Sequence, residues 1–275
     1  MGQQTKVSAA QRRIRRRRTG GKKSSSVPAA AHPKRILSID VGGSGVKLSR
    51  SGLKTVRRLE SGPTFTPWQL VREVQAATQD WKFDAIALGF PGRVGENGPL
   101  SQPDNLGRGW VNFDFGKAFG KPVRIINDAA MQALGSYGGG RMLFLGLGTG
   151  FGSTLVSGST IVSLELGRLL IKRRLTLGEV AGKAGLKKFG RKAWQGMLRR
   201  IIPALREAAM ADYVVLGGGN GRKLKRLPPL VRRGHNDNAL HGGFRLWNVE
   251  GVPQHAGSGR RRRQTASWRL AWRSV

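Results

Sequence analysis

One stretch near the start of the chain indicates its fold class: Ile36-Leu37-Ser38-Ile39-Asp40-Val41-Gly42-Gly43-Ser44-Gly45-Val46. The apolar run up to Asp40 predicts a short buried strand, and a second strand is expected from Val46 to Arg50. The glycine-rich turn between them can take positive φ angles and bring its backbone N–H groups close to an anion. A single turn of this kind is more often a tight hairpin, so for this turn alone both interpretations stay open.

The same order of elements occurs twice along the chain. In the first copy we expect a strand over 54–60, a helix that begins at Pro67 behind the N-cap Thr66 and ends near Gln79, and a strand over 85–89. A strand over 123–127 and a helix from Asp128 to about Ser136 follow. The second copy comprises strands over 142–147, 153–156 and 160–163, a helix over 190–210 kinked at Pro203, and a strand over 213–216. This recurrence predicts an α/β protein with an internal duplication and two lobes, whose cleft would hold a ligand site.

Two further glycine clusters follow apolar strands, as the first one does. Gly148–Gly152 follows the strand over 142–147, and Gly217–Gly221 follows the strand over 213–216 and precedes a possible helix start. Three clusters in equivalent positions favour phosphate binding over three unrelated hairpins. They do not form a dinucleotide-binding fingerprint, because the first turn leads to a strand rather than a helix, and the sequence has no GxxxxGK[ST] loop.

Three of the 15 acidic residues stand out by position. Asp40 ends the first strand beside the first glycine turn, where a carboxylate can orient Mg²⁺ or its waters near phosphates. Asp128 at a strand-to-helix junction could cap the helix or accept a proton from an attacking hydroxyl. Glu165 lies between two leucines on a segment expected to be half-buried, so it needs either a ligand or an ion pair with a nearby arginine.

Six motifs resemble those of the ROK sugar kinases in order and spacing, from about residue 36 to Trp247. They are Asp40–Lys47 (DxGGTxxK with Ser for Thr), Gly89–Gly92, Asn127–Ala129 (NDA), Leu147–Gly152, Glu165–Arg168 (ExGH with Arg for His) and Val214–Asn220. Within that family the short chain, the absence of the cysteine-containing zinc segment and the run Gly242–Trp247 resemble the polyphosphate glucokinase group. The resemblance implies a two-lobed actin/hexokinase-like (ribonuclease H-like) fold. It also implies phosphoryl transfer from polyphosphate, ATP or both to the 6-hydroxyl of glucose or a related hexose.

The resemblance also implies roles for individual residues. Asp128 would be the catalytic base, and Asp40 would hold Mg²⁺ through water. The sugar would be bound by Asn105, Asn127, Asp128, Glu165 and Arg168. The donor phosphates would be bound by Asp40, Gly42, Gly43, Ser44, Lys47, Gly148, Thr149, Gly150, Gly217, Gly218 and Gly219. Mg²⁺ would be required and zinc would not, and by analogy with the family the chain would form a homodimer.

Two features depart from the family pattern. Arg168 replaces the motif histidine, and because arginine only donates hydrogen bonds, the preference for glucose and the activity itself stay open. Glu179 aligns only loosely with a second sugar-contacting glutamate. Neither basic end of the chain belongs to the pattern.

Charge gives a second line of evidence. The net charge is +34, with no acid in residues 1–35 or 251–275, while residues 36–250 hold 32 basic and 15 acidic residues. We therefore expect disordered basic tails over 1–35 and 251–275, flanking an N-terminal lobe over 36–127 and a C-terminal lobe over 128–250. The tails would bind polyanions non-specifically. The basic residues expected to line a polyphosphate track are Lys172, Arg173, Arg174, Lys183, Lys187, Lys188, Arg191 and Lys192.

An alternative explanation of the charge is a nucleic-acid- or polyanion-binding protein on a catalytically weak or dead kinase fold. The absence of cysteine excludes disulfides and thiolate zinc sites. No apolar run is long enough to cross a membrane, and no secretory signal is evident, so the default expectation is a cytoplasmic protein.

Overall fold

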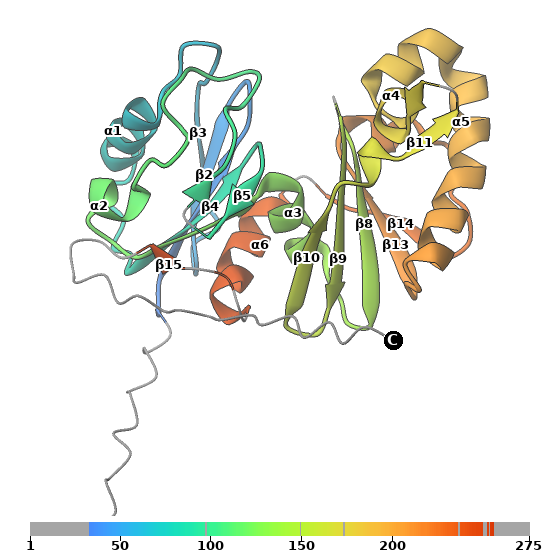
Figure 1. The fold of residues 1–275 in the computed structure, drawn as a ribbon. Coiled ribbons are helices and arrows are strands. Elements are labelled where there is room, and N and C mark those ends of the chain that lie inside the picture. The colour runs from blue at the N-terminus through green and yellow to red at the C-terminus, as the bar shows by residue number, and fades with distance from the viewer. Residues whose placement is uncertain are drawn as a thin grey trace, which may run out of the picture. The chain divides into compact units, whose positions relative to one another are not determined.

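The computed structural model describes residues 33–96, 98–148, 150–172, 174–235, 237–249, 252, 254 and 255. Most of both expected tails, together with Thr149 and Arg173, therefore lies outside the described residues. The rest forms an α/β fold built on two mixed sheets (Figure 1). In this part of the chain no helix is long and apolar enough to cross a membrane.

The first sheet has the strand order β15-β7-β4-β1-β2-β3. Its central strand β1 runs antiparallel to β2, with Asp40 opposite Lys47, and parallel to β4. The strands are β1 (Ile36–Val41), β2 (Val46–Arg50), β3 (Val56–Leu59), β4 (Ala85–Phe90), β7 (Val123–Asn127) and β15 (Gln254–His255). A small hairpin of β5 (Val94–Gly95) and β6 (Gly98–Pro99) follows β4.

The second sheet repeats this plan in the order β10-β9-β8-β13-β14. Its strand β8 is antiparallel to β9 and parallel to β13, as β1 is to β2 and β4. The strands are β8 (Arg141–Leu147), β9 (Phe151–Ser157), β10 (Thr160–Leu164), β13 (Tyr213–Gly217) and β14 (Val231–Arg233). The predicted internal duplication is therefore confirmed strand by strand. The short strands β11 (Leu170–Lys172) and β12 (Leu175–Thr176) form a separate hairpin.

The helices follow local sequence rules with one correction. Helix α1 (Pro67–Ala77) begins where predicted, because Thr66 and Gln69 form a reciprocal capping box. Helix α5 (Lys183–Ala208) is broken at Gly190 (φ 72°, ψ 162°), a break that was not predicted, while the kink expected at Pro203 inside the same helix stays a prediction. The remaining helices are α2 (Phe115–Phe119), α3 (Asp128–Ser136), α4 (Leu177–Ala181), α6 (Asn238–Arg245) and the 3₁₀ turns η1 (Leu166–Arg168), η2 (Gly219–Lys223) and η3 (Leu246–Asn248).

Helices α3 and α6 lie side by side and touch through glycines (Figure 1). A Cβ atom on Gly135 would lie 1.7 Å from the Asn238 carbonyl oxygen, and one on Gly242 would lie 1.7 Å from the Met131 carbonyl oxygen. Asn238 Nδ2 also donates a hydrogen bond to Ser136 Oγ at 2.9 Å. Only glycine allows two helix backbones to approach this closely, so these two positions fix the contact.

The C-terminal part of the chain returns to the first sheet. Helix α6 packs on β1, where Gly243 leaves room for the buried Ser38, and β15 pairs with β7. The Arg124 guanidinium donates to the carbonyl oxygens of Leu246 (2.8 Å) and Val249 (2.9 Å). The lobe boundaries given above stay a prediction, but α6 and β15 are in contact with the first sheet.

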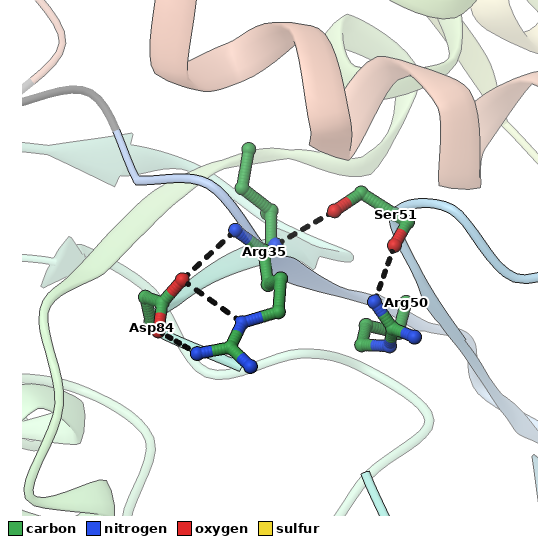
Figure 2. Close-up of polar contacts among 5 residues, drawn as sticks. Arg35, Arg50, Ser51 and Asp84 are labelled. Atoms are coloured by element: carbon green, nitrogen blue, oxygen red, sulfur yellow. Dashed lines mark hydrogen bonds and ion pairs between the residues drawn. The ribbon is translucent and has the colours of Figure 1, made fainter. Parts of the chain in front are cut away.

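Polar contacts hold the start of β1 in place (Figure 2). The carboxylate of Asp84 accepts hydrogen bonds from the backbone N–H and the guanidinium of Arg35. The backbone N–H of Ile36 donates to Ser51 Oγ at 2.9 Å, and Arg50 donates to the Ser51 carbonyl oxygen. Arg35, which belongs to the region expected to be a tail, therefore takes part in holding the start of the first sheet.

Candidate active site

The first glycine turn lies directly after β1 and presents Asp40 beside it. The Gly42 N–H donates to the Gly45 carbonyl oxygen at 3.0 Å, and Ser61 Oγ donates to the Gly42 carbonyl oxygen at 2.7 Å. Burial raises the pKa of Asp40 to about 6, although the Lys47 cation on the neighbouring strand opposes the rise. The turn is thus a rigid hairpin with a half-buried carboxyl group at its base.

Asn105 belongs to the same place in the fold. A Cβ atom on Gly43 would lie 2.8 Å from Asn105 Cβ, so the loop before α2 rests on the first glycine turn. Ser44, at the tip of this turn, is exposed. The structure therefore brings together an amide side chain predicted to bind sugar and a turn predicted to bind phosphate.

Asp128 is the first residue of α3, directly after β7. The helix is capped by Asn127, whose Oδ1 accepts from the N–H groups of Ala129 (3.0 Å) and Ala130 (3.2 Å). The Asn127 amide also donates to the Gly92 carbonyl oxygen at 3.0 Å. The capping role considered for Asp128 therefore falls to Asn127, and Asp128 is left for another function.

The ionisation of Asp128 is strongly perturbed. Burial, together with the nearby Asp40 carboxylate, raises the pKa of Asp128 to about 7, while the hydrogen bond from the Ala129 N–H opposes the rise. A carboxyl group with a pKa near neutrality can gain and lose a proton under ordinary conditions. This is the electrostatic setting that a general base requires.

The second glycine turn lies against the start of α3. A Cβ atom on Gly152 would lie 2.8 Å from Ala129 Cβ, so β9 approaches the residue that follows Asp128. The Gly148 N–H donates to the Gly150 carbonyl oxygen at 3.2 Å. Asp128 therefore lies close to the second turn as well as to Asp40 at the first.

The third glycine cluster packs on the second turn. Gly218 has φ 76°, and a Cβ atom there would lie 2.5 Å from the Leu147 carbonyl oxygen. The buried Asn220 donates through Nδ2 to the Gly148 carbonyl oxygen at 2.9 Å. The expected helix start after this cluster is wrong, because η2 is a single 3₁₀ turn and offers no α-helix N-terminus to an anion.

Glu165 and Arg168 flank the turn η1. Both side chains are exposed, and Arg168 Nε lies 3.5 Å from Glu165 Oε2. The segment is half-buried at Leu164 and Leu166, as expected, but the Glu165 side chain points to solvent, and the ion pair considered for it is present. A Cβ atom on Gly167 would lie 2.9 Å from the Phe151 carbonyl oxygen, which places η1 beside the second glycine turn.

Two acidic residues differ from the sequence expectations. The Glu179 carboxylate accepts from the Thr176 N–H at 2.7 Å in a capping box, so it already has a structural role. Asp237, the N-cap residue of α6, was not predicted, yet its negative charge contributes to the raised pKa of Asp40. The duplication gives the signal for it, because Asp237 lies at the start of α6, one position before its first residue, and Asp128 lies at the start of α3.

Comparison with known proteins gives a consistent picture. The polyphosphate glucokinase of Mycobacterium tuberculosis (strain CDC 1551 / Oshkosh) is 25% identical over 226 residues, which cover 74% of this chain and 84% of the relative. The inorganic polyphosphate/ATP-glucomannokinase of Arthrobacter sp. strain KM has a TM-score of 0.65 at 22% identity, over 78% of this chain and 98% of that one. In sequence the chain is similar to polyphosphate glucokinases, and in fold it is similar to ROK sugar kinases. The ROK hexokinase of Thermus thermophilus gives a TM-score of 0.60 at 20% identity, over 78% and 97% of the two chains.

These similarities confirm the actin/hexokinase-like two-lobed fold predicted from the ROK motifs. No family model matches the sequence. The agreement between motif order and fold is therefore carried by the individual relatives and by the duplicated sheet topology.

The carboxylate ligand beside the first glycine turn is consistent with a bound divalent cation. Within the described ranges, no three His, Asp or Glu side chains lie close enough together to form a metal site. Mg²⁺ in phosphoryl transfer is held by few carboxylates, by water and by the phosphates of the substrate, so Asp40 alone fits such a role. The cation would neutralise charge on the donor phosphates when bound.

Proposed function

We propose that this chain is a sugar kinase that transfers a phosphoryl group from polyphosphate or ATP to the 6-hydroxyl of glucose or a related hexose. The observation that carries the proposal is Asp128, a carboxyl with a pKa of about 7 that lies beside both glycine turns. Proteins similar to this chain in sequence are named as polyphosphate glucokinases. The nucleic-acid-binding alternative is not favoured, because these relatives are named as kinases.

In the proposed reaction, the ionised Asp128 accepts the proton of the sugar 6-hydroxyl. The hydroxyl oxygen bonds to the terminal phosphorus of the donor, and the bond from that phosphorus to its bridging oxygen breaks. The leaving phosphate keeps the electron pair of that bond. Backbone N–H groups of the two glycine turns, other than those of Gly42 and Gly148, which donate within their turns, stabilise negative charge on the donor. Catalysis therefore rests on positioning and on electrostatics.

Asn105, Asn127, Glu165 and Arg168 are proposed to bind the sugar hydroxyls. Their support is that Asn105 lies on the first turn, Asn127 begins α3, and the Glu165–Arg168 pair lies beside the second turn. Because Arg168 and Glu165 pair with each other, this ion pair would have to open partly for both side chains to bind a sugar. A requirement for Mg²⁺, a homodimer and a cytoplasmic location also stay predictions.

The test is a direct assay of the purified full chain with Mg²⁺, several hexoses and either polyphosphate or ATP. We expect a hexose 6-phosphate from at least one donor, and loss of the product when the cation is chelated. The absence of sugar phosphate with both donors across all hexoses would overturn the proposal.

A further inference from the structure

A concentration of positive charge lies next to the third glycine cluster. Five exposed side chains from α5 and η2 form it, and we call them the α5–η2 basic patch: Arg191, Lys192, Arg199, Arg222 and Lys223. The two elements are joined by a hydrogen bond in which Gln195 Nε2 donates to the Lys223 carbonyl oxygen at 2.6 Å. The patch is therefore built on two elements that a hydrogen bond joins.

The geometry of α5 places its three patch residues on the side that adjoins η2. Arg191 and Lys192 precede Gln195 by four and three residues, and Arg199 follows it by four. Residues at these spacings share one face of a helix. Trp194, Leu198 and Ile202 anchor the neighbouring face in the core of the second lobe, so the orientation of the basic side chains is fixed.

The patch is connected to the proposed donor site through η2. Asn220, two residues before Arg222, donates to the Gly148 carbonyl oxygen in the second glycine turn. A donor whose reacting phosphate lies at this turn can therefore extend along η2 toward α5. The connection runs over backbone that is held by hydrogen bonds at both ends.

The positive charge of the patch has no counter-charge nearby in sequence or in contact. No acid occurs between Lys183 and Arg206 or between Tyr213 and Gly234. In the part of the chain that the structure describes, no patch residue takes part in an ion pair. Like charges held together repel one another, and an anion bound across them relieves that repulsion.

We propose that the α5–η2 basic patch binds the part of a polyphosphate chain that lies beyond the reacting phosphates. This inference rests on the proposed kinase function. A polyphosphate donor carries negative charge along its whole length and can meet all five cations. ATP ends in an uncharged nucleoside and cannot.

Single-stranded nucleic acid fits the patch less well. Such ligands are bound by basic grooves combined with aromatic side chains on which the bases stack. The aromatic residue on this part of α5, Trp194, is fully buried, and its indole N–H donates to the Ala181 carbonyl oxygen. The patch thus offers charge without a stacking surface, which favours a simple polyphosphate.

The patch differs from the polyphosphate track expected from sequence, and that track stays a prediction. Of that set, only Arg191 and Lys192 belong to the patch, because the break at Gly190 separates them from the basic residues of the first part of α5. The other three members of the patch are Arg199, Arg222 and Lys223, which the contact between Gln195 and Lys223 brings together.

The experiment compares two triple variants of the full chain that remove the same charge. The patch variant combines Lys192→Gln, Arg199→Gln and Lys223→Gln. The control combines Lys54→Gln, Arg72→Gln and Lys117→Gln, which are exposed residues of the first lobe. Binding of long-chain polyphosphate is measured by titration calorimetry, and KM is measured for long-chain polyphosphate, tripolyphosphate and ATP.

We expect the patch variant to bind long-chain polyphosphate roughly tenfold more weakly or worse, with a shallower dependence on salt, because phosphate contacts are lost. KM for the long chain rises in parallel, while kcat and the KM values for ATP and tripolyphosphate stay within about twofold. An equal loss in the control variant would overturn the proposal.

A single-stranded RNA oligonucleotide is titrated in parallel. If the patch variant loses RNA affinity as strongly as polyphosphate affinity, the patch is a nucleic-acid site and the polyphosphate assignment is overturned. Wild-type chain that transfers no phosphate would overturn the proposed function separately, and the binding titrations would still decide whether the patch holds polyphosphate.

Discussion

Asp128 is the residue on which the proposed chemistry depends. We expect Asp128→Asn to lower kcat by roughly 10²–10⁴-fold, because the amide cannot accept the hydroxyl proton. In the wild type, kcat should rise with pH through about 7, as Asp128 ionises. Steady-state assays from acid to alkaline pH measure both effects. Turnover in the variant close to that of the wild type would contradict the assignment.

Asp128 should also affect stability, because the ionised form that catalysis requires makes the folded chain less stable. Because the folded-state pKa of Asp128 (about 7) lies above the ordinary carboxyl value, the folded chain holds more protons than the unfolded chain between the two. Its contribution to stability is therefore present in acid and is lost as pH rises through about 7. We expect Asp128→Asn to be more stable than wild type by roughly 1–3 kcal/mol near pH 8, and the gap to shrink near pH 5. Urea unfolding at both pH values measures this difference, and an unchanged gap would argue against burial as the cause.

Arg168 is the residue that sets this chain apart from the family motif. Its guanidinium lies 3.5 Å from the Glu165 carboxylate and competes with a sugar for it. We expect Arg168→His to lower KM for glucose, because the shorter side chain frees Glu165. Initial rates over a range of glucose concentrations test this. An unchanged KM would show that the arginine is already compatible with sugar.

At the scale of elements, the contact between α3 and α6 depends on its glycines. We expect Gly135→Ala to destabilise the chain by roughly 1–3 kcal/mol or more, because the new methyl group would overlap the backbone at Asn238. The matched control is Gly196→Ala on α5, where a Cβ atom meets nothing within 4 Å. That change should stabilise by roughly 0.5–1 kcal/mol through helix propensity. Thermal unfolding of both variants measures the difference, and equal effects would refute the close-packing argument.

The elements also show what can be predicted from sequence and what cannot. Helix α3 was predicted at its observed bounds, because a strand, a capping asparagine and a helical pattern occur in immediate succession. The break in α5 at Gly190 was not predicted, since the glycine that breaks the helix looks like any other glycine in a basic run. The pairing of β15 with β7 joins residues more than a hundred positions apart, and local pattern carries no information about such contacts.

The candidate site divides in the same way. Asp40, Asp128 and the glycine turns could be placed because each directly follows an apolar strand. The exposure of Glu165 and the approach of Asp237 to Asp40 could not, because both depend on how distant elements pack.

At the scale of the whole molecule, we expect the basic residues at the two ends of the chain to bind polyanions non-specifically, separately from the proposed donor site. Residues 1–32 hold nine Lys or Arg and residues 256–275 hold six, with no acid in either. We expect deletion of both segments to weaken non-specific polyanion binding and to flatten its salt dependence, while phosphoryl transfer persists. Arg35 is kept in this variant because it pairs with Asp84. Loss of transfer on deletion would show that the tails take part in catalysis.

The reciprocal glycine contact between α3 and α6 has an evolutionary consequence. Gly135 of α3 lies against the backbone of α6 at Asn238, and Gly242 of α6 lies against the backbone of α3 at Met131. Reciprocity of this kind characterises an isologous dimer, in which one surface binds its own copy. A single polypeptide that contains such an interface no longer has to keep its two halves identical. One half can retain Asp128 for proton transfer, while the equivalent helix start in the other half, at Asp237, is free to acquire a different role.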